Sequence, residues 1–269
     1  MLSCLVGSEM CIRDRLTKID RDDLKENLLI GKTHPELKHL DLPSNKNPNS
    51  IFKILRKKNI LLHHPYDLFK TSVEEFINKA ADDPLVMAIK ITLYRVSQDS
   101  PIIAALMRAA ENGKEVMTLV ELKARFDEDN NIQWAKQLEQ AGIHVVYGII
   151  GFKTHTKIAL IVRKEKGRLR NYFHIGTGNY NSNTSKFYTD LGLLSTDPDI
   201  ASDLLELFNY LSGFSKQKSY QKLLVSPSSM REKFIFLIKR EIKNAEEGKK
   251  AEIIAKMNSL VDPEIIKLL

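Results

Sequence analysis

The chain has 269 residues, 43% of them hydrophobic, which is enough for one large globular domain or two smaller ones. No apolar run reaches the roughly 18 residues that a transmembrane helix needs. The formal net charge of +7 favours polyanionic partners such as nucleotides, nucleic acid, polyphosphate or acidic lipid. A solvated surface without anion preference would give the same total charge.

The opening segment, residues 1–15, reads MLSCLVGSEMCIRDR and has no helix cap and no clean periodicity. It looks like a translated sequencing-adapter artefact, so we leave it out of the expected fold. Both cysteines, Cys4 and Cys11, lie in it. The rest of the chain can therefore hold neither a disulfide nor a thiolate metal site, and we expect a cytoplasmic protein.

Residues 16–60 are polar and broken, which is typical of the tail of a preceding domain followed by a linker. From residue 61 strands and helices alternate. The apolar runs predict strands at 86–94, 115–122, 143–149, 156–162, 170–175 and 188–195. The 3.6-residue periodicity predicts helices at 51–58, 73–81, 130–141 and 199–211, and one that begins at Ser100 and ends at Asn112. This order predicts an α/β sandwich with helices on both faces of a mixed sheet.

The pattern changes after Ser215. It predicts a helix at 230–247, a strand at 251–257 and a last helix that Asp262 and Pro263 open. We interpret this segment as the truncated start of a second, similar domain. The alternative is a helical tail that folds back on the first domain.

His155 and Lys157 are the most informative residues of the chain. Residues two apart on an extended strand share one face. An imidazole with an unperturbed pKa of about 6.5 is largely neutral at pH 7 and can act as a nucleophile. A neighbouring ammonium can hold a phosphoryl oxygen. The pair predicts phosphoryl transfer through a covalent phosphohistidine, whereas a lone strand histidine is more often structural.

A Gly-x-Gly-Asn turn, with Gly176, Gly178 and Asn179, follows a predicted strand. Such a turn can present backbone N–H groups to an oxyanion. Alone it is a weak signal, but it gains weight after His-x-Lys. Tyr188 comes soon afterwards and could stack on a base, donate to a phosphate, or be a half-buried strand residue.

Arg95 and Arg125 end two predicted parallel strands. Arginines at the carboxyl ends of strands in one sheet can converge on a phosphate. The spacing alone leaves open the alternative that they pair with nearby acids on the surface.

Five segments, taken in order, resemble bacterial polyphosphate kinases, a branch of the phospholipase D-like superfamily. They are ITLYRVSQDS, ELKARFDE, GFKTHTKIALI, HIGTGNYN and FYTDLGLL. The general phospholipase D motif has an Asp where this chain has Val162, and that departure matches the kinase branch. The resemblance covers roughly residues 53–269. It implies that residues 16–60 end a head domain, that 61–222 form a first catalytic domain with the phospholipase D-like fold, and that 223–269 begin a second.

The resemblance implies reversible transfer of the ATP γ-phosphate to polyphosphate through a phosphohistidine at His155. It implies Mg²⁺ with ATP, and it makes Arg95 and Arg125 clamps on the Mg–phosphate complex, since a guanidinium cannot ligate a metal. It implies nucleotide contact at Tyr188. The implied partners are ATP or ADP, polyphosphate and, in the full-length protein, further copies of the chain. No nucleic acid is expected, and peripheral membrane association stays open.

The family's second catalytic histidine, an ATP-contacting arginine and its N-terminal ATP-binding domain have no counterpart in this sequence. We therefore expect little or no kinase activity from this polypeptide alone. Two other hypotheses remain: a phospholipase D-like phosphodiesterase or nuclease half-site that acts as a homodimer, and a non-catalytic polyanion-binding module.

Overall fold

The computed structural model describes residues 31–40, 50–94, 96, 100–121, 128–149, 151–215, 219–257 and 259–269. The chain divides into two compact units, Met1–Ala201 and Ser202–Leu269. The first unit contains all of the strands named below. None of the described helices is long and apolar enough to cross a bilayer.

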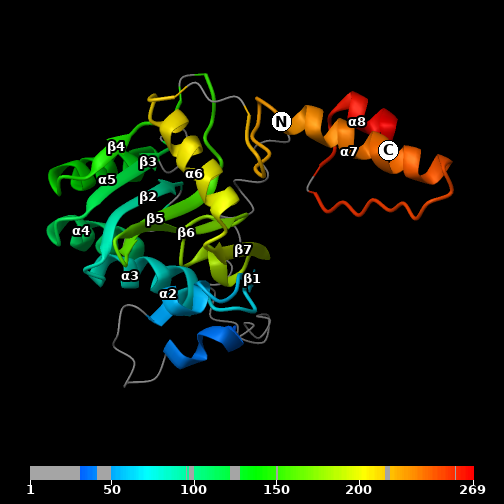
Figure 1. The fold of residues 1–269 in the computed structure, drawn as a ribbon. Helices are drawn as coiled ribbons and strands as arrows, with labels where there is room; N and C mark the ends of the chain where they lie inside the picture. The colour runs from blue at the N-terminus through cyan, green and yellow to red at the C-terminus, as the bar shows by residue number, and fades with distance from the viewer. Residues whose placement is uncertain are drawn as a thin grey trace, which may run out of the picture. The chain divides into compact units, whose positions relative to one another are not determined.

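One seven-stranded sheet, with the spatial order β1-β7-β6-β5-β2-β3-β4, forms the centre of the first unit (Figure 1). β2, β3 and β4 run parallel, and every other neighbouring pair is antiparallel. The mixed sheet that the sequence predicts is thereby confirmed. The strands are β1 (Ile60–His64), β2 (Val86–Leu93), β3 (Glu115–Val120), β4 (His144–Val146), β5 (Lys157–Glu165), β6 (Arg168–Gly176) and β7 (Asp190–Ser195).

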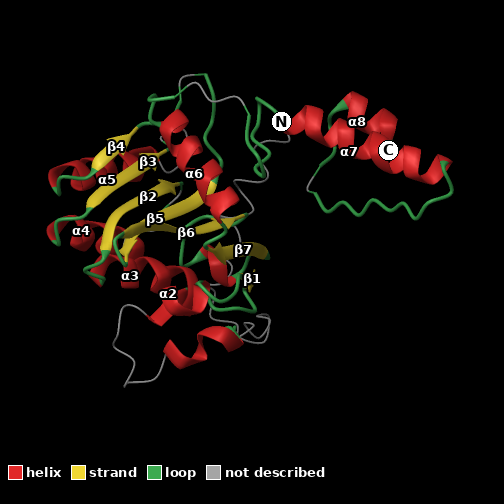
Figure 2. Cartoon of the chain, viewed as in Figure 1, coloured by secondary structure: helices red, strands yellow, loops and turns green. Residues whose placement is uncertain are grey.

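Helical segments separate the strands as far as β4, whereas β4, β5 and β6 follow one another without a helix between them (Figure 2). The α-helices are α2 (Ser50–Leu55), α3 (Glu75–Asp82), α4 (Pro101–Glu111), α5 (Glu128–Gln140), α6 (Pro198–Leu211), α7 (Met230–Glu246) and α8 (Pro263–Leu268). The shorter turns are η2 (Pro35–Leu40), η3 (Lys70–Glu74) and η4 (Thr184–Lys186). α4 begins where the sequence places it, because the Ser100 side chain caps the helix by accepting from the backbone N–H of Ile103 at 3.4 Å.

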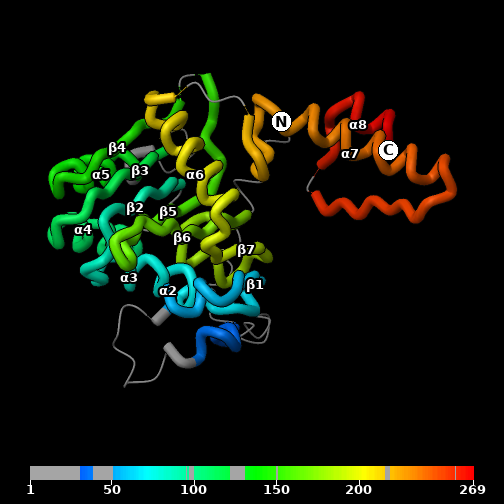
Figure 3. The backbone as a smooth tube through the Cα atoms, in the orientation of Figure 1, coloured from blue at the N-terminus to red at the C-terminus, as the bar shows by residue number. Residues whose placement is uncertain are grey.

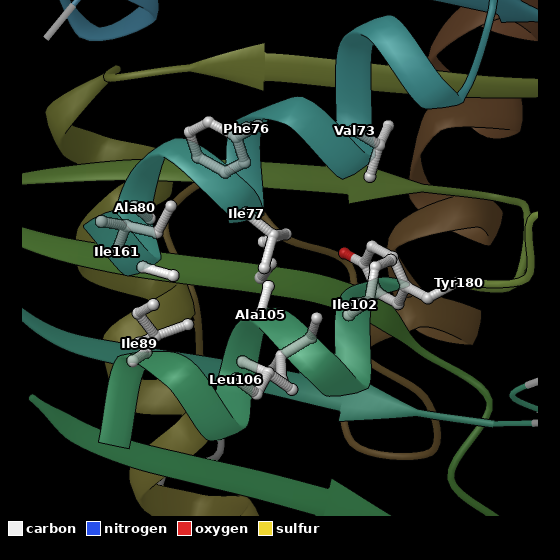
Figure 4. Packing of buried hydrophobic residues seen from close by; sticks show 14 of the residues in the cluster. Val73, Phe76, Ile77, Ala80, Ile89, Ile102, Ala105, Leu106, Ile161 and Tyr180 are labelled. Atoms are coloured by element: carbon white, nitrogen blue, oxygen red, sulfur yellow. The ribbon is translucent and has the colours of Figure 1, made fainter. Parts of the chain in front are cut away.

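The core of the first unit lies between the sheet and helices α3 and α4 (Figure 4). Ile77 of α3 and Ala105 of α4 are fully buried, and Ile77 points toward Ala105 above the sheet. β2 and β5 contribute Ile89 and Ile161 to the same cluster. The layer of apolar side chains fixes which face of β5 is covered and therefore how the residues before β5 emerge from the sheet.

β5 and β6 form a long hairpin (Figure 3). At one end Lys166 and Gly167 make a two-residue turn, with φ angles of 47° and 79°. Two positive φ values are typical of the type I′ turn that suits antiparallel strands. At the other end Lys157 pairs with Gly176. The hairpin therefore separates the charged turn from the His-x-Lys motif by the full length of β5.

Three sequence-based expectations differ from the structure. Residues 251–257 form no strand, although their composition favours one, and they are largely exposed. The strand expected at 143–149 is confined to His144–Val146. β1 was not predicted, because its five residues alternate between buried and exposed positions and end in two histidines.

The second unit holds α7 and α8. Asp262 caps α8, as the sequence predicts, by accepting from the backbone N–H groups of Glu264 and Ile265. The same carboxylate receives Arg231 of α7 at 2.7 Å, and Arg231 also reaches Glu264 at 2.8 Å. These ion pairs join the two helices on an exposed surface.

Candidate functional site

The residues of the candidate site lie where β2 and β3 end and β5 begins. β5 is antiparallel to β2, and the register pairs Ile91 with Ala159. β5 therefore begins where β2 ends, and the parallel strand β3 ends at the same edge. Tyr94, Glu121 and the segment 151–156 consequently meet there.

The ring of Tyr94 lies close to both residues of the His-x-Lys motif. The His155 ring meets it edge-on, with 5.7 Å between ring centroids. The Lys157 ammonium lies 5.5 Å from the Tyr94 centroid and donates to the backbone carbonyl of His155 at 2.5 Å. His155 is exposed, whereas Lys157 is only 4% exposed. The imidazole thus faces solvent beside a buried positive charge.

Burial lowers the pKa of Lys157 from 10.5 to about 8. The carboxylate of Asp190 opposes this shift, and the ammonium of Lys153 adds to it. Lys153 lies 5.2 Å from the Tyr94 ring centroid, so both ammonium groups are held near one aromatic ring. At pH 7 Lys157 remains mostly protonated, and the site keeps its positive potential.

Side chains on β2 and after β3 hold the backbone on both sides of His155. The Glu121 carboxylate, 3% exposed, accepts from the backbone N–H of Thr154 at 2.6 Å. The Thr92 hydroxyl donates to the carbonyl of Thr156 at 2.8 Å and accepts from the N–H of Ile158 at 3.1 Å. The backbone around His155 is therefore fixed by buried groups, while its side chain is exposed.

The Gly-x-Gly-Asn turn lies beside the start of β5. Gly176 pairs with Lys157 on one side and with Gly192 on the other. A Cβ atom on Gly178 would lie 2.7 Å from Oδ2 of Asp190, which is too close for any side chain. Thr177 donates to the same Asp190 carboxylate at 2.8 Å. Close approach to Asp190 thus explains the glycine at position 178.

Asn179 closes this turn, and its side-chain oxygen is buried. Among the residues that the structure describes, this oxygen has no hydrogen-bond partner. The sequence predicts a phosphate-contacting role for the turn, which stays a prediction.

Two buried histidines, His64 of β1 and His174 of β6, lie beneath the turn. Complete burial, with a smaller effect of His64, lowers the pKa of His174 to about 3, so the ring is neutral. Its Nδ1 lies 2.8 Å from the Tyr180 hydroxyl. A Cβ atom on Gly192 would lie 2.6 Å from Nε2 of His174. The glycines therefore leave room for a neutral imidazole that supports the turn.

The structure brings together five of the predicted site residues: His155, Lys157, Gly176, Gly178 and Asn179. Tyr188 is exposed and lies two residues before β7, and its predicted nucleotide contact remains a prediction. Arg95 and Arg125 lie outside the described residues.

Sequence reasoning missed the roles of Tyr94, Glu121, Thr92 and Asp190. No local pattern marks them, because each acts on a segment distant in sequence. The only available signal was position, since Tyr94 and Glu121 lie at the ends of the strands predicted at 86–94 and 115–122. In the described part of the chain no three His, Cys, Asp or Glu side chains are grouped to hold a metal ion.

Comparison with known proteins shows which family this chain resembles. Residues 50–217 match the model of polyphosphate kinase C-terminal domain 1, and residues 223–269 match that of C-terminal domain 2. The chain is 71% identical over 220 residues to a polyphosphate kinase of Parasynechococcus marenigrum (strain WH8102). It is 70% identical over 220 residues to that of Prochlorococcus marinus (strain MIT 9313). Each alignment covers 82% of this chain and 31% of the relative.

A solved structure supports the same assignment. The crystal structure of polyphosphate kinase from Porphyromonas gingivalis matches 89% of this chain and 39% of its own, with a TM-score of 0.76 and 37% sequence identity. The chain therefore spans about a third of the length of the relatives it matches. With a family model covering more than half of its residues, the chain belongs to the polyphosphate kinase family.

Proposed function

We propose that this chain carries the phosphoryl-accepting part of a polyphosphate kinase, which transfers the ATP γ-phosphate reversibly to inorganic polyphosphate through His155. One observation carries the proposal: the exposed His155, whose backbone carbonyl accepts from the buried Lys157 ammonium, stands on a backbone that Glu121 and Thr92 fix from either side. Membership of the family makes polyphosphate the acceptor to test first.

The transfer would proceed as an in-line displacement. The lone pair of one His155 ring nitrogen forms a bond to the γ-phosphorus, while the P–O bond to ADP breaks and its electron pair leaves on the β-phosphate. A terminal oxygen of polyphosphate then attacks the phosphohistidine, and the N–P pair returns to the ring. The reverse sequence makes ATP from polyphosphate.

Cations and backbone dipoles would stabilise the charge on the transferred group. Lys157 supplies a fixed charge beside the imidazole, and Lys153 adds a second one on the exposed side. We assign phosphate contacts to the backbone N–H groups of the 176–179 turn, nucleotide contact to Tyr188, and phosphate clamping to Arg95 and Arg125.

Mg²⁺ would neutralise charge on the β- and γ-phosphates when ATP is bound. The described residues include no cluster of three ligating side chains. This fits an ion that binds chiefly through the nucleotide's own phosphates, as Mg²⁺ commonly does. We therefore propose that the chain contributes positive side chains around the complex instead of direct ligands.

The proposed partners are ATP or ADP, polyphosphate and further copies of the full-length chain in a homo-oligomer. We propose a cytoplasmic location, in keeping with the absence of cysteine after residue 15. Peripheral membrane association is compatible with the positive charge, and nucleic acid is not among the proposed partners. Because the chain spans about a third of its relatives, we expect little or no net polyphosphate synthesis by this polypeptide alone.

Radiolabelling tests the proposal at the level of His155. The purified chain is incubated with Mg²⁺ and either γ-labelled ATP or labelled polyphosphate, and protein-bound label is assayed for lability to acid. We expect acid-labile label in the wild type and in the His144→Ala variant, whose histidine is exposed on β4. We expect none in His155→Ala.

Equal label in the wild type and His155→Ala, or no label from either donor, contradicts the proposal. Hydrolysis of a phosphodiester without ATP would instead favour the phosphodiesterase reading. Polyphosphate binding without any covalent label would favour a polyanion-binding module.

A further inference from the structure

The opposite end of β5 from His155 carries a second set of positive side chains around a pocket of about 220 Å³. β5 has nine residues, so the two ends are about 26 Å apart at the usual rise of a strand. The pocket is lined by Lys53, Arg56, Leu85, Arg163, Glu165 and Lys166. We propose that this pocket binds a non-reacting segment of the polyphosphate chain; the inference rests on the proposed function.

Positive charge is in excess at the pocket. Four of its lining side chains are cationic, and Glu165 is the only acidic one among them. The Glu165 carboxylate is already occupied: it accepts from Arg163 at 2.5 Å, from Arg56 at 3.0 Å and from the Tyr172 hydroxyl at 2.6 Å. It therefore organises the cations without neutralising all of them.

The wall of the pocket is rigid. Arg163 is 4% exposed, donates to Asp83 at 2.9 Å, and stacks over the Phe52 ring with 5.2 Å to its centroid. A guanidinium has five N–H donors, and Arg56, 36% exposed, uses one of them on Glu165 in the described contacts. Arg56 thus keeps donors for a bound phosphate.

Two lysines complete the pocket from its open side. Lys166 occupies the type I′ turn of the hairpin, and Lys53 projects from the exposed side of α2. Among the described residues neither ammonium forms an ion pair, so both can serve as point charges for phosphate oxygens.

The chemistry of the lining favours condensed phosphate over a nucleotide. Arginines and lysines match phosphate oxygens. The described lining contains no aromatic side chain on which a base could stack, although stacking usually provides much of the affinity for single-stranded nucleic acid. A chain held here would keep its free end at a high effective concentration near His155.

Site-resolved chemical protection tests the inference on the unaltered chain. Lysine amines are acetylated with and without inorganic polyphosphate, and modification is read by mass spectrometry. We expect polyphosphate to protect Lys53 and Lys166 in both the wild type and His155→Ala, while ADP alone protects neither. Protection of the exposed Lys153 without protection of Lys53 and Lys166 would overturn the inference and leave the proposed function standing.

Binding of inorganic polyphosphate gives the second measurement. The Lys53→Gln/Lys166→Gln variant removes two charges but leaves the Glu165 network intact. We expect about tenfold weaker binding and a salt dependence that is less steep by about one to two units. The control, Lys136→Gln/Lys239→Gln, removes two exposed charges from α5 and α7 and should change affinity little.

Equal affinities of the two double variants would contradict the inference, as would equal protection of Lys53 and Lys166 by single-stranded RNA at the same phosphate concentration. If His155 takes no label while Lys53 and Lys166 are still protected by polyphosphate alone, the phosphoryl-transfer proposal fails and the pocket stands as a polyphosphate site.

Discussion

The backbone N–H of Thr154 donates to the Glu121 carboxylate across 2.6 Å, which ties the residue before His155 to the end of β3. Glu121 also holds α5, because its backbone carbonyl accepts from the Asn131 side chain at 3.0 Å. A buried carboxylate just after β3 thus fixes the backbone next to His155, the proposed nucleophile, which lies just before β5.

Glu121→Ala should slow labelling of His155 by about tenfold to a hundredfold, because a displacement of the order of 1 Å is enough to disturb a reacting geometry. Glu121→Gln keeps an acceptor oxygen and should recover part of the rate. The measurement is the initial rate of acid-labile labelling, with circular dichroism to check the fold. If Gln and Ala slow labelling equally, Glu121 does not act by holding the Thr154 N–H.

Gly178→Ala should also lower the labelling rate, since the new Cβ would lie 2.7 Å from Oδ2 of Asp190 and must displace that carboxylate. Asp190 would lose its contact with Thr177 and its attraction for Lys157. Gly178→Ala/Asp190→Gly removes the clash, because the atoms that the new Cβ would meet at 2.7, 2.8 and 3.0 Å are Oδ2, Cγ and Cβ of Asp190, and it should recover activity toward that of Asp190→Gly alone. A double variant that is slower than both single variants would contradict this explanation.

The Lys157 ammonium predicts a pH-dependent stability. Its pKa is about 8 in the folded chain and 10.5 in the reference state, so the unfolded chain binds more protons between these values. The free energy of unfolding contributed by this group therefore rises from pH 8 to pH 10.5, and below pH 8 the cost of the buried charge is fully present.

Lys157→Met should remove this contribution. The free energy of unfolding of the wild type, minus that of Lys157→Met, should rise by on the order of 1 to 3 kcal/mol as the pH increases through that window. Urea denaturation at several pH values measures it. A difference that does not change with pH would show that Lys157 titrates as an exposed lysine does.

Arg163→Met should destabilise the first unit by about 3 to 5 kcal/mol, because Asp83 and Glu165 would lose their buried partner. Arg170→Gln is the matched control: Arg170 also pairs with Glu165, at 3.3 Å, but is 47% exposed. Its loss should cost less than about 1 kcal/mol. Equal shifts of the urea midpoint in the two variants would contradict the assignment of Arg163 as a buried structural charge.

Local signals made much of the sheet and its helices predictable. The apolar run that predicts β2 and the Ser100 cap that predicts the start of α4 both depend on residues adjacent in sequence, and the structure confirms both elements. β1 escaped detection because it is short and its stability depends on pairing with β7. The segment 251–257 shows the converse, since strand-favouring residues form no strand when no ladder is available to them.

The candidate site was predictable only in part, for the same reason. Spacing placed His155 beside Lys157, and the order of the motifs placed both near the Gly176 turn. Spacing could not show that the Lys157 ammonium turns back to the His155 carbonyl, nor that Glu121 reaches Thr154. Such contacts depend on strand register, which is set by the packing of the whole sheet.

The register between β1 and β7, in which Ile60 pairs with Leu194, also orders events during synthesis. β1 leaves the ribosome before any other strand of the sheet, whereas its partner is the last strand to be made. The backbone N–H and C=O groups of β1 have no strand partner until the six later strands have been translated. Pairing between segments so far apart in sequence is slow. We therefore expect the growing chain to assemble the β2–β6 part of the sheet first and to complete its β1 edge last.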